Sequence, residues 1–320
     1  MEIKARVLEM LENNIGNSIS GEEIAKELSI SRNSVWKAIN SLKNDGYKIN
    51  AQTKRGYELS TENDLFTASS IKKHLKRECE ILIYDEIDSS NNTAKKLAQA
   101  GMAEGTLIIA KKQTSGKGRM GRSFISNEEN GLYMSLILRP TIPANECIDI
   151  TVIGAVAVAE AIEATSNKKC SIKWVNDVFV DDKKACGILT EASVSFESAS
   201  LDYVVLGIGI NVTEPKNGFN DEIKDIAGAV LEKNIVGYKS RLCAEIINRF
   251  FDYYNEIKNR EFINIYKSKS NIIGKDVSVY RGNEIVNGTC IDIDDNANLV
   301  VKSGEKIFKF SSGEARARKQ

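Results

Sequence analysis

Histidine is almost absent from this chain, which has only His74 among its 320 residues. One histidine cannot supply a metal site with several histidine ligands, and it argues against a catalytic triad built on histidine. Any chemistry must therefore use lysine, arginine, aspartate, asparagine and backbone amides.

Paired cysteines and long apolar runs are also lacking. The six cysteines are scattered without a C-x-x-C pair, which predicts reduced thiols and excludes both a disulfide framework and a cysteine zinc site. The longest apolar stretch, residues 152–159, is far shorter than the roughly 20 residues of a membrane span. The first residues alternate charged and apolar side chains, so we expect no signal peptide, no membrane contact and a cytoplasmic location.

Net charge is lacking as well, since 44 basic residues balance 44 acidic ones. Apolar residues make up 42% of the chain and charged residues 28%, which is typical of a globular protein. At roughly 100–200 residues per domain, the length predicts two or three domains.

Although the whole chain has no net charge, two neighbouring segments near its start carry net charges of opposite sign. Residues 1–30 carry three basic and six acidic side chains, whereas residues 31–55 carry six basic side chains and only one acid. Apolar spacing predicts a helix from Ile3 to Leu11, a second helix opened by a capping box at Ser20, and a third capped by Ser31. A hairpin is predicted over 47–59.

Three helices followed by a basic hairpin predict a winged helix-turn-helix. The third helix would enter the major groove and the hairpin turn would hold phosphate. The predicted DNA-binding residues are Ser31, Arg32, Asn33, Ser34, Lys37, Asn40, Lys54 and Arg55. An ordinary solvated basic face on a small helical domain remains the alternative.

The remainder of the chain divides into two segments of different composition. After a linker at 62–64, strand-like and helical runs alternate up to about residue 271, including strands at 81–84, 106–110, 133–138 and 203–208 and a buried helix at 151–165. After residue 274, short strands separated by tight turns predict a small β-barrel. The predicted domains are therefore 1–62, 63–271 and 272–320.

Residues 111–122 form a glycine-rich basic segment. They include five positive charges and no acid, and Gly116, Gly118 and Gly121 allow the backbone to approach a ligand closely. This pattern favours a phosphate-binding loop. It also fits G-x-G-x-x-G, but a poor helix former follows and position 141 is threonine, so we reject the dinucleotide-binding fold. A purely structural glycine loop remains possible.

Four further segments place polar groups at or near the ends of strands. Residues 88–93 collect small hydrogen-bonding side chains before a helix, although simple helix capping would also explain them. Residues 173–177 and 184–189 bring lysines and an acid beside apolar strands, and a charge at a buried edge needs a partner. Residues 207–211 end another strand with Asn211.

These segments, in this order, resemble the signatures of bifunctional biotin protein ligases that also act as biotin operon repressors. The resemblance rests on Ser-Ser-Asn (89–91), Gln-Thr-Ser-Gly-Lys-Gly-Arg-Met-Gly-Arg (113–122), Lys-Trp-Val-Asn-Asp (173–177), Lys-Ala-Cys-Gly-Ile-Leu (184–189) and Gly-Ile-Gly-Ile-Asn (207–211). It covers essentially the whole chain. It implies an α+β fold with a winged helix-turn-helix, a central domain like that of class II synthetases and an SH3-like C-terminal barrel.

The resemblance also implies a two-step reaction. Biotin and Mg-ATP would form biotinyl-5′-adenylate, and the acyl group would pass to a lysine of the biotin carboxyl carrier protein of acetyl-CoA carboxylase. The adenylate would also act as corepressor, favouring a homodimer that binds operator DNA of biotin genes. The alternatives are a regulator that senses a ligand without catalysis, a lipoate ligase, and a ligase whose N-terminal domain no longer binds DNA.

Site residues follow from the resemblance by position. Lys184 would bridge the biotin carboxylate and the α-phosphate, Phe124 would stack on adenine, and Asp177 would orient Mg²⁺ or a cation. The catalytic residues implied are Lys184, Arg119, Lys173 and Asp177. Those implied for biotin are Ser89, Ser90, Asn91, Gln113, Lys117, Gly118, Arg119, Lys184 and Gly187. Those implied for ATP or the adenylate are Gly116, Lys117, Arg119, Arg122, Phe124, Asn176 and Asn211.

Three positions depart from the usual family pattern. Lys117 replaces an arginine and loses its bidentate geometry, which predicts looser retention of the adenylate. Phe124 replaces a tryptophan and should stack more weakly. Val175 replaces a proline and adds a backbone N–H. None of these changes removes a charge that the reaction needs.

Overall fold

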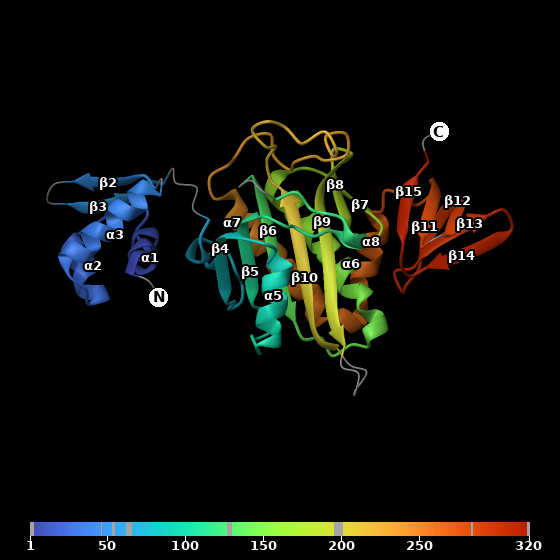
Figure 1. Cartoon of the computed structure of the whole chain (residues 1–320), viewed down its shortest axis with the longest axis horizontal. Helices are drawn as coiled ribbons and strands as arrows, with labels where there is room; N and C mark the ends of the chain where they lie inside the picture. Colours follow the sequence, from blue (N-terminus) through green and yellow to red (C-terminus); the bar gives the residue numbers. More distant parts are fainter. Residues whose placement is uncertain are drawn as a thin grey trace. The chain divides into compact units, whose positions relative to one another are not determined.

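The computed structural model describes residues 3–45, 47–52, 55–61, 66–126, 130–194, 201–282 and 284–318. They form two compact units, residues 1–74 with 235–240 and residues 75–234 with 241–320 (Figure 1). The predicted linker at 62–64 lies outside the described residues. In the ranges described, none of the helices combines the length and apolar character needed to cross a membrane.

The first unit contains helices and a three-stranded antiparallel sheet of order β1-β3-β2. Its helices are α1 (Ile3–Asn13), α2 (Gly21–Leu28), α3 (Arg32–Asn44) and α4 (Ala68–Lys72), and its strands are β1 (Ser18–Ile19), β2 (Ile49–Gln52) and β3 (Gly56–Leu59). The predicted order of three helices and a hairpin is confirmed. The pairing of β1 with β3 was not predicted, because two residues carry no periodicity.

Side-chain caps begin α2 and α3, as the sequence predicts. Ser20 accepts a hydrogen bond from the Glu23 backbone N–H at 3.0 Å, and Ser31 accepts one from the Ser34 N–H at 3.0 Å. The inward face of α3 is buried in the core of the unit and consists of Val35, Ala38, Ile39 and Leu42. The polar residues of α3 are thereby left on its outer face.

A seven-stranded mixed sheet of order β4-β5-β6-β10-β9-β8-β7 forms the centre of the second unit. Its strands are β4 (Ile81–Ile87), β5 (Leu107–Gln113), β6 (Gly131–Leu138), β7 (Cys170–Lys173), β8 (Asp177–Val180), β9 (Lys183–Val194) and β10 (Leu201–Asn211). β4 and β5 are parallel, and the other neighbouring pairs are antiparallel. The four strands predicted here from composition correspond to β4, β5, β6 and β10 and are confirmed.

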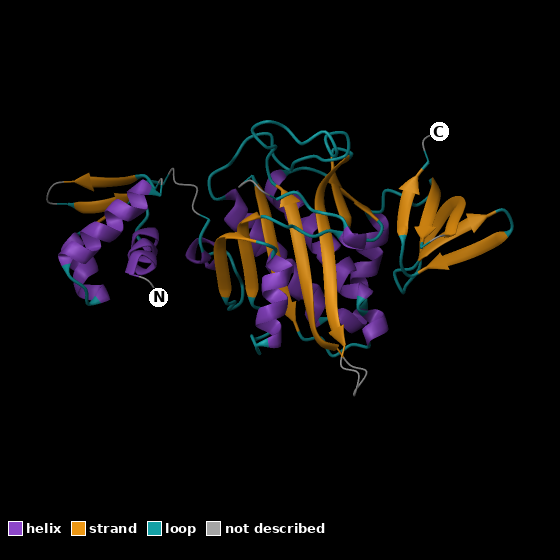
Figure 2. Ribbon diagram, viewed as in Figure 1, coloured by secondary structure: helices purple, strands orange, loops and turns teal. Residues whose placement is uncertain are grey.

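Helices cover both faces of this sheet (Figure 2). Ala94 of α5 (Ser90–Gln99) clusters with Val205, whereas Gly154 of α6 (Ile148–Ser166) faces Leu206. Successive residues of a strand point to opposite faces, so α5 and α6 lie on opposite sides of β10. The other helices are α7 (Tyr238–Asn255) and α8 (Glu261–Ser268).

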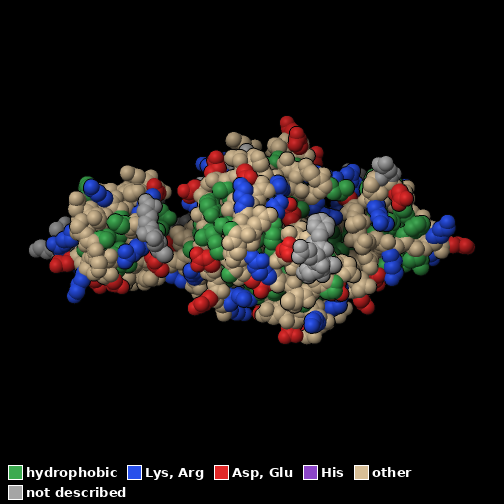
Figure 3. Space-filling model, turned by 60° about the horizontal axis from the view of Figure 1, so that its bottom comes forward, with side chains coloured by type: hydrophobic (Ala, Val, Ile, Leu, Met, Phe, Trp, Pro, Cys, Tyr) green, Lys and Arg blue, Asp and Glu red, His purple; other side chains and the backbone are tan. Residues whose placement is uncertain are grey.

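The C-terminal segment is a five-stranded antiparallel sheet of order β14-β13-β12-β11-β15. Its strands are β11 (Asp276–Arg281), β12 (Glu284–Ile293), β13 (Leu299–Ser303), β14 (Lys306–Phe310) and β15 (Glu314–Ala317). The prediction of short strands with tight turns is confirmed. Basic and acidic side chains are interspersed over the visible face of both units, in keeping with the absence of net charge (Figure 3).

Candidate active site

Three glycines leave one face of the central sheet without side chains where β9 pairs with β10. Gly187 pairs with Gly209 across the two strands, and Gly207 lies two residues away on the same face. A Cβ atom at Gly209 would lie 2.7 Å from the Phe124 ring, and one at Gly207 would overlap the Asn91 side chain. These positions therefore need glycine because other residues occupy the space above them.

Buried polar groups form a wall beside this glycine floor. Ser89, Ser90, Asn91 and Gln113 are each less than 9% exposed and line one pocket. The Gln113 Oε1 accepts from the Ser90 backbone N–H at 2.7 Å, and its Nε2 donates to Ser126 Oγ at 2.9 Å. Ser89 occupies the N-cap position of α5 without any side-chain capping bond, so simple capping does not explain this segment.

The predicted glycine-rich basic segment folds back over the pocket. The Phe124 N–H donates to Gly116 O at 2.9 Å, and the Gly118 N–H donates to Arg122 O at 2.7 Å. A side chain at Gly116 would collide with the Phe124 carbonyl oxygen. The Phe124 ring contacts Tyr133 edge to face, with 6.3 Å between ring centroids. The segment is thus closed upon itself, with its cations beside the glycine floor.

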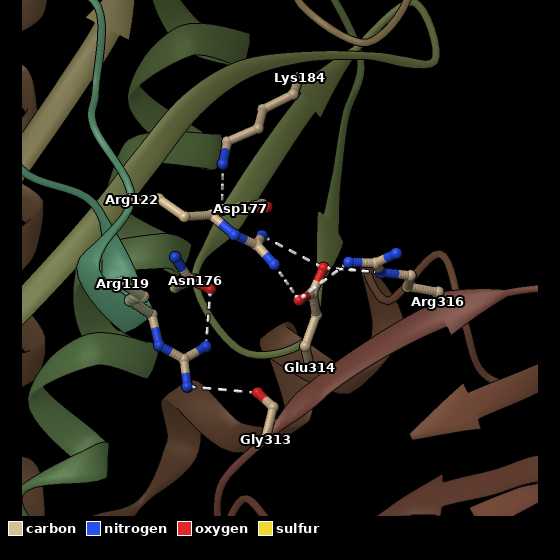
Figure 4. Close-up of polar contacts among 8 residues, drawn as sticks. All are labelled: Arg119, Arg122, Asn176, Asp177, Lys184, Gly313, Glu314 and Arg316. Atoms are coloured by element: carbon tan, nitrogen blue, oxygen red, sulfur yellow. Dashed lines mark hydrogen bonds and ion pairs between the residues drawn. The ribbon is translucent and has the colours of Figure 1, made fainter. Parts of the chain in front are cut away.

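Three cations converge on the pocket from two elements. Lys117 and Arg119 come from the glycine-rich segment, and Lys184 comes from β9. Lys184 Nζ lies 2.8 Å from Asp177 Oδ1, and Arg119 donates to the Asn176 side-chain oxygen at 2.9 Å (Figure 4). Burial lowers the pKa of Arg119, and the carboxylate of Asp177 partly offsets this. The site therefore favours an anionic ligand, which would compensate these charges.

The segment 173–177 provides the side chains that contact Arg119 and Lys184. Asn176 donates from Nδ2 to Ile188 O at 3.0 Å, which fixes the amide that Arg119 contacts. Trp174 donates from Nε1 to Ala297 O, and Tyr266 donates its hydroxyl to Val175 O. Burial also lowers the pKa of Lys173, and Asp177 again acts in the opposite direction. Trp174 is only 3% exposed, so its ring is part of the core.

The C-terminal sheet contacts the glycine-rich basic segment through Glu314. Its carboxylate accepts hydrogen bonds from Arg122 of the glycine-rich segment and from Arg316 of β15 (Figure 4). Arg119 also donates to Gly313 O at 3.3 Å. Burial raises the pKa of Glu314, but the hydrogen bonds and charges of Arg122 and Arg316 outweigh it and lower the pKa to about 2. The C-terminal domain thus anchors the basic segment.

The stabilisation of the fold by the ion pairs of Glu314 should depend on pH. The folded pKa of Glu314 lies below its ordinary value of 4.5, so its stabilising effect is complete above that pH and is lost as the pH falls toward about 2. Thermal unfolding of wild type and Glu314→Gln between pH 7 and pH 3 should give midpoints that converge at the acidic end. Parallel curves would show that the ion pairs do not stabilise the fold.

The structure brings together most of the predicted site residues. One pocket is lined by Ser89, Ser90, Asn91, Gln113, Lys117, Gly118, Arg119, Phe124, Asn176, Lys184 and Gly187. Gly116, Arg122, Lys173, Asp177 and Asn211 are not among its lining residues. Asn211 donates to Gly228 O at 3.1 Å, at the end of β10. The assignment of individual roles stays a prediction.

Sequence analysis missed several residues of this region. Ser135, Glu191, Gly207 and Glu314 contact the pocket wall or the basic segment, yet only Gly207 fell within a predicted site motif and Ser135 only within a predicted strand. Their partners are distant in the chain, so no local pattern marks them. The one signal that could have indicated Ser135 is the alternation of side chains between the two faces of β6, β9 and β10.

The first unit presents the predicted DNA-binding side chains on α3 and the hairpin. Asn33, Lys37 and Arg55 are exposed, and Arg32 forms an ion pair with Glu22 at 2.7 Å. The Ser31 and Ser34 hydroxyls contact each other at 2.8 Å as part of the cap, and Asn40 is half-buried. Lys54 lies outside the described residues. Trp36, 54% exposed on the same helix, was not predicted as a contact.

Comparison with known families matches all three segments of the chain. Residues 84–211 match the biotin/lipoate A/B protein ligase family, residues 4–58 match an HTH domain, and residues 272–315 match the biotin protein ligase C-terminal domain. A helix-turn-helix unit joined to a basic, glycine-floored pocket of this kind defines a protein ligase that carries a DNA-binding domain.

Whole-chain relatives agree with this class. The chain is 38% identical to the bifunctional ligase/repressor BirA of Bacillus spizizenii over 92% of this chain and 93% of that protein. It is 36% identical to BirA of Bacillus subtilis over the same shares. The structure of the Aquifex aeolicus biotin protein ligase with biotin and ATP, 28% identical, covers 75% of this chain and 99% of that one with a TM-score of 0.65.

The chain belongs to the family of bifunctional ligase/repressor proteins. The prediction of a biotin protein ligase joined to a repressor domain is thereby confirmed, as is the α+β organisation with a helix-turn-helix and a C-terminal β-domain.

Proposed function

We propose that this chain joins biotin to ATP in the pocket between β9, β10 and the glycine-rich segment, forming biotinyl-5′-adenylate. The observation that carries this proposal is the convergence of Lys117, Arg119 and Lys184 on one pocket that also has a buried polar wall. Cations are placed where two anions must meet, and hydrogen-bonding groups are placed where an uncharged head group would sit.

The cations address the main physical difficulty of the reaction. A carboxylate and a phosphate about 4 Å apart repel each other by about 4 kcal/mol at an effective dielectric constant near 20. Lys184, held at 2.8 Å by Asp177, would exchange this partner for the two ligand anions. Arg119 would stabilise the charge that develops on the α-phosphate as the acyl–phosphate bond forms.

The polar wall supports biotin over lipoate as the substrate. Ser89, Ser90, Asn91 and Gln113 offer donors and acceptors that a ureido ring would satisfy. A dithiolane ring would offer no matching polar atoms to this wall, and a site built for hydrogen bonds strongly rejects ligands that lack them. Phe124 would lie against adenine, with Asn176 nearby.

Closure by the glycine-rich segment would protect the mixed anhydride from water until the acceptor arrives. The acyl group would then pass to a lysine of the biotin carboxyl carrier protein of acetyl-CoA carboxylase. A relative in Mycobacterium tuberculosis is named for the same enzyme, as a biotin–[acetyl-CoA-carboxylase] ligase. Both events would take place in the cytoplasm.

In this proposal Mg²⁺ would arrive bound to ATP. Within the ranges that the structure describes, no group of three or more His, Cys, Asp or Glu side chains could hold a metal ion. Asp177 is engaged by Lys184, which suits the orienting of a cation better than the binding of Mg²⁺. Mg²⁺ would therefore accompany the ATP phosphates, with Asp177 orienting a cation beside them.

In repression, the first unit would bind operator DNA. The outer face of α3 would enter the major groove, where Lys37 would reach a flanking phosphate, and the hairpin would also contact phosphate. The adenylate would act as corepressor by favouring a homodimer, which spans two half-sites of an operator in the biotin genes.

Replacing Lys37 by alanine should weaken operator binding and lower the salt dependence by about one unit of log K against log [salt], because one phosphate contact is lost. Gel shifts at several salt concentrations with the promoter DNA of the organism's biotin genes measure this. Lys26→Ala, in the last turn of α2, is the matched control. An unchanged slope would exclude Lys37 from the interface.

Biotin-dependent exchange of pyrophosphate with ATP tests the ligase proposal. Purified protein with biotin, ATP and Mg²⁺ should exchange label, and lipoate should not replace biotin. Lack of exchange with biotin would refute adenylate formation and favour a ligand sensor without catalysis. Exchange without any gel shift would favour a ligase that no longer regulates genes.

A further inference from the structure

Trp36, on α3, is 54% exposed, although tryptophan is among the side chains that gain most from burial. On the same helix, Val35, Ile39 and Leu42 are each 1% exposed and belong to the core of the first unit. These anchors fix the rotation of α3, so the indole cannot turn inward unless they turn outward. The fold therefore holds the Trp36 ring at the surface.

The exposed indole has no partner within the protein. In the ranges that the structure describes, no cation or aromatic ring lies against it and its N–H has no hydrogen-bond acceptor. Arg32, one turn earlier on α3, pairs instead with Glu22 of α2 at 2.7 Å. Trp174, by contrast, is 3% exposed and donates to Ala297 O. The open face of Trp36 is therefore available to an external partner.

The surroundings of Trp36 indicate the chemistry of that partner. Residues 31–44 include the basic side chains Arg32, Lys37 and Lys43 and no acid. The centre of a protein–protein interface is depleted of charge, and a stable one buries about 800 Å² on each side. One aromatic ring among cations and amides fits a nucleic acid better, because the cations match the phosphates and the ring matches the bases.

The position of Trp36 along α3 favours a base over the sugar–phosphate backbone. Proteins with a helix-turn-helix contact base edges with the first residues of the second helix of the motif. Trp36 is the fifth residue of α3 and lies one turn from both Asn33 and Asn40. An indole ring offers mainly apolar surface, and the apolar group that a base pair presents in the major groove is the C5-methyl group of thymine.

We infer that Trp36 recognises a thymine in the operator by packing its indole ring against the C5-methyl group of that base. This inference rests on the proposed binding of operator DNA by the first unit, and it adds which kind of base is recognised and by which side chain. Lys37, as a phosphate contact, sets the affinity for any DNA, whereas Trp36 sets the preference among sequences.

Replacing thymine by uracil tests the contact from the side of the DNA. Uracil lacks only the C5-methyl group and keeps every hydrogen-bonding atom of thymine. Footprinting on the promoter DNA of the biotin genes first delimits the operator, and each of its thymines is then replaced in turn. With the full chain, biotin, ATP and Mg²⁺ at fixed salt, one position should lose about fourfold in affinity, the value of one buried methyl group.

The same series with Trp36→Ala identifies the side chain. Operator affinity should fall about tenfold or more, because most of the apolar contact is lost. Uracil at the sensitive position should then cost less than about twofold. The dependence of binding on salt and the affinity for unrelated DNA should stay near wild type, since no phosphate contact is removed. Trp36→Phe keeps a ring and should retain much of the uracil effect.

Two controls separate this result from damage to the protein. The uracil effect is a ratio between two DNA molecules, so it does not depend on the fraction of a variant that is folded. Ile285→Ala removes another exposed apolar side chain, which is 58% exposed on β12 of the C-terminal sheet. This variant should bind the operator as wild type does and should show the full uracil effect.

Fluorescence gives a second measurement on the wild-type protein. The chain has two tryptophans, and acrylamide should quench mainly Trp36 because Trp174 is buried. Bound operator should protect Trp36 from acrylamide, and Trp36→Phe should abolish this change. Emission that stays as accessible with bound operator as without it would place the ring outside the DNA interface. Protection that grows with protein concentration in the absence of DNA would place it between two copies of the chain.

The outcomes distinguish this inference from the proposal on which it rests. Wild-type protein that binds no promoter DNA of the biotin genes would refute operator binding itself. Operator binding in which no thymine methyl group matters, or in which uracil costs the same in wild type and Trp36→Ala, would overturn the role of Trp36 alone.

Discussion

Replacing Lys184 by alanine should reduce the rate of biotin-dependent pyrophosphate exchange by about 10²–10³-fold, the loss typical of removing a group that stabilises developing charge. Lys184 lies on β9, the strand that carries Gly187 of the glycine floor, and its Nζ is already 2.8 Å from an anion, Asp177. Without it, no cation of β9 that lines the pocket would neutralise the carboxylate as it meets the phosphate. An unchanged exchange rate would show that the bridging cation is misassigned.

Two further variants make this result specific. Lys183→Ala removes a neighbouring lysine, whose ammonium contacts Lys224 O, and should keep the wild-type rate. Lys184→Ala leaves the half-buried Asp177 without its partner, which costs stability. Lys184→Ala/Asp177→Asn should recover the thermal midpoint but not the rate, which separates folding from catalysis.

Replacing Gly207 by alanine should weaken biotin binding by at least about 100-fold, measured by calorimetry. The added methyl group would overlap the Asn91 amide, which is buried and held on its other side by Glu191. Either the amide or β10 must move, and the pocket wall moves with it; such overpacking commonly costs about 1–3 kcal/mol, and a displaced hydrogen bond adds to it.

Ile210→Val is the control for this variant, since it trims a buried side chain of the same strand away from Asn91. It should bind biotin as wild type does. Comparable binding by Gly207→Ala and wild type would show that the ligand does not depend on the position of Asn91.

Local patterns were enough to predict the elements that carry the site. The apolar spacing of α3 predicted its buried face, because only a helix brings Val35, Ala38, Ile39 and Leu42 to one side. The β-branched runs predicted the strands at the centre of the sheet, whose side chains are buried on both faces. Glycines and cations in one short segment predicted the phosphate-binding loop.

The network that supports the site could not be predicted in this way. Asn91 and Glu191 are 100 positions apart, and Arg122 and Glu314 are 192 apart. A single glutamate or serine on a strand gives no sign of what it faces until the register of that strand is known. The functional groups of a site are thus visible as local clusters, whereas the groups that orient them are set by the tertiary structure.

A crystal structure of the full chain with biotinyl-5′-adenylate tests the central claim most directly. We predict that Lys184 Nζ contacts both the biotinyl carbonyl oxygen and the α-phosphate, with Arg119 on the phosphate and the ureido ring against Ser90. An adenylate bound elsewhere, or one bound here while Lys184 stays on Asp177 and touches neither group, would contradict the account.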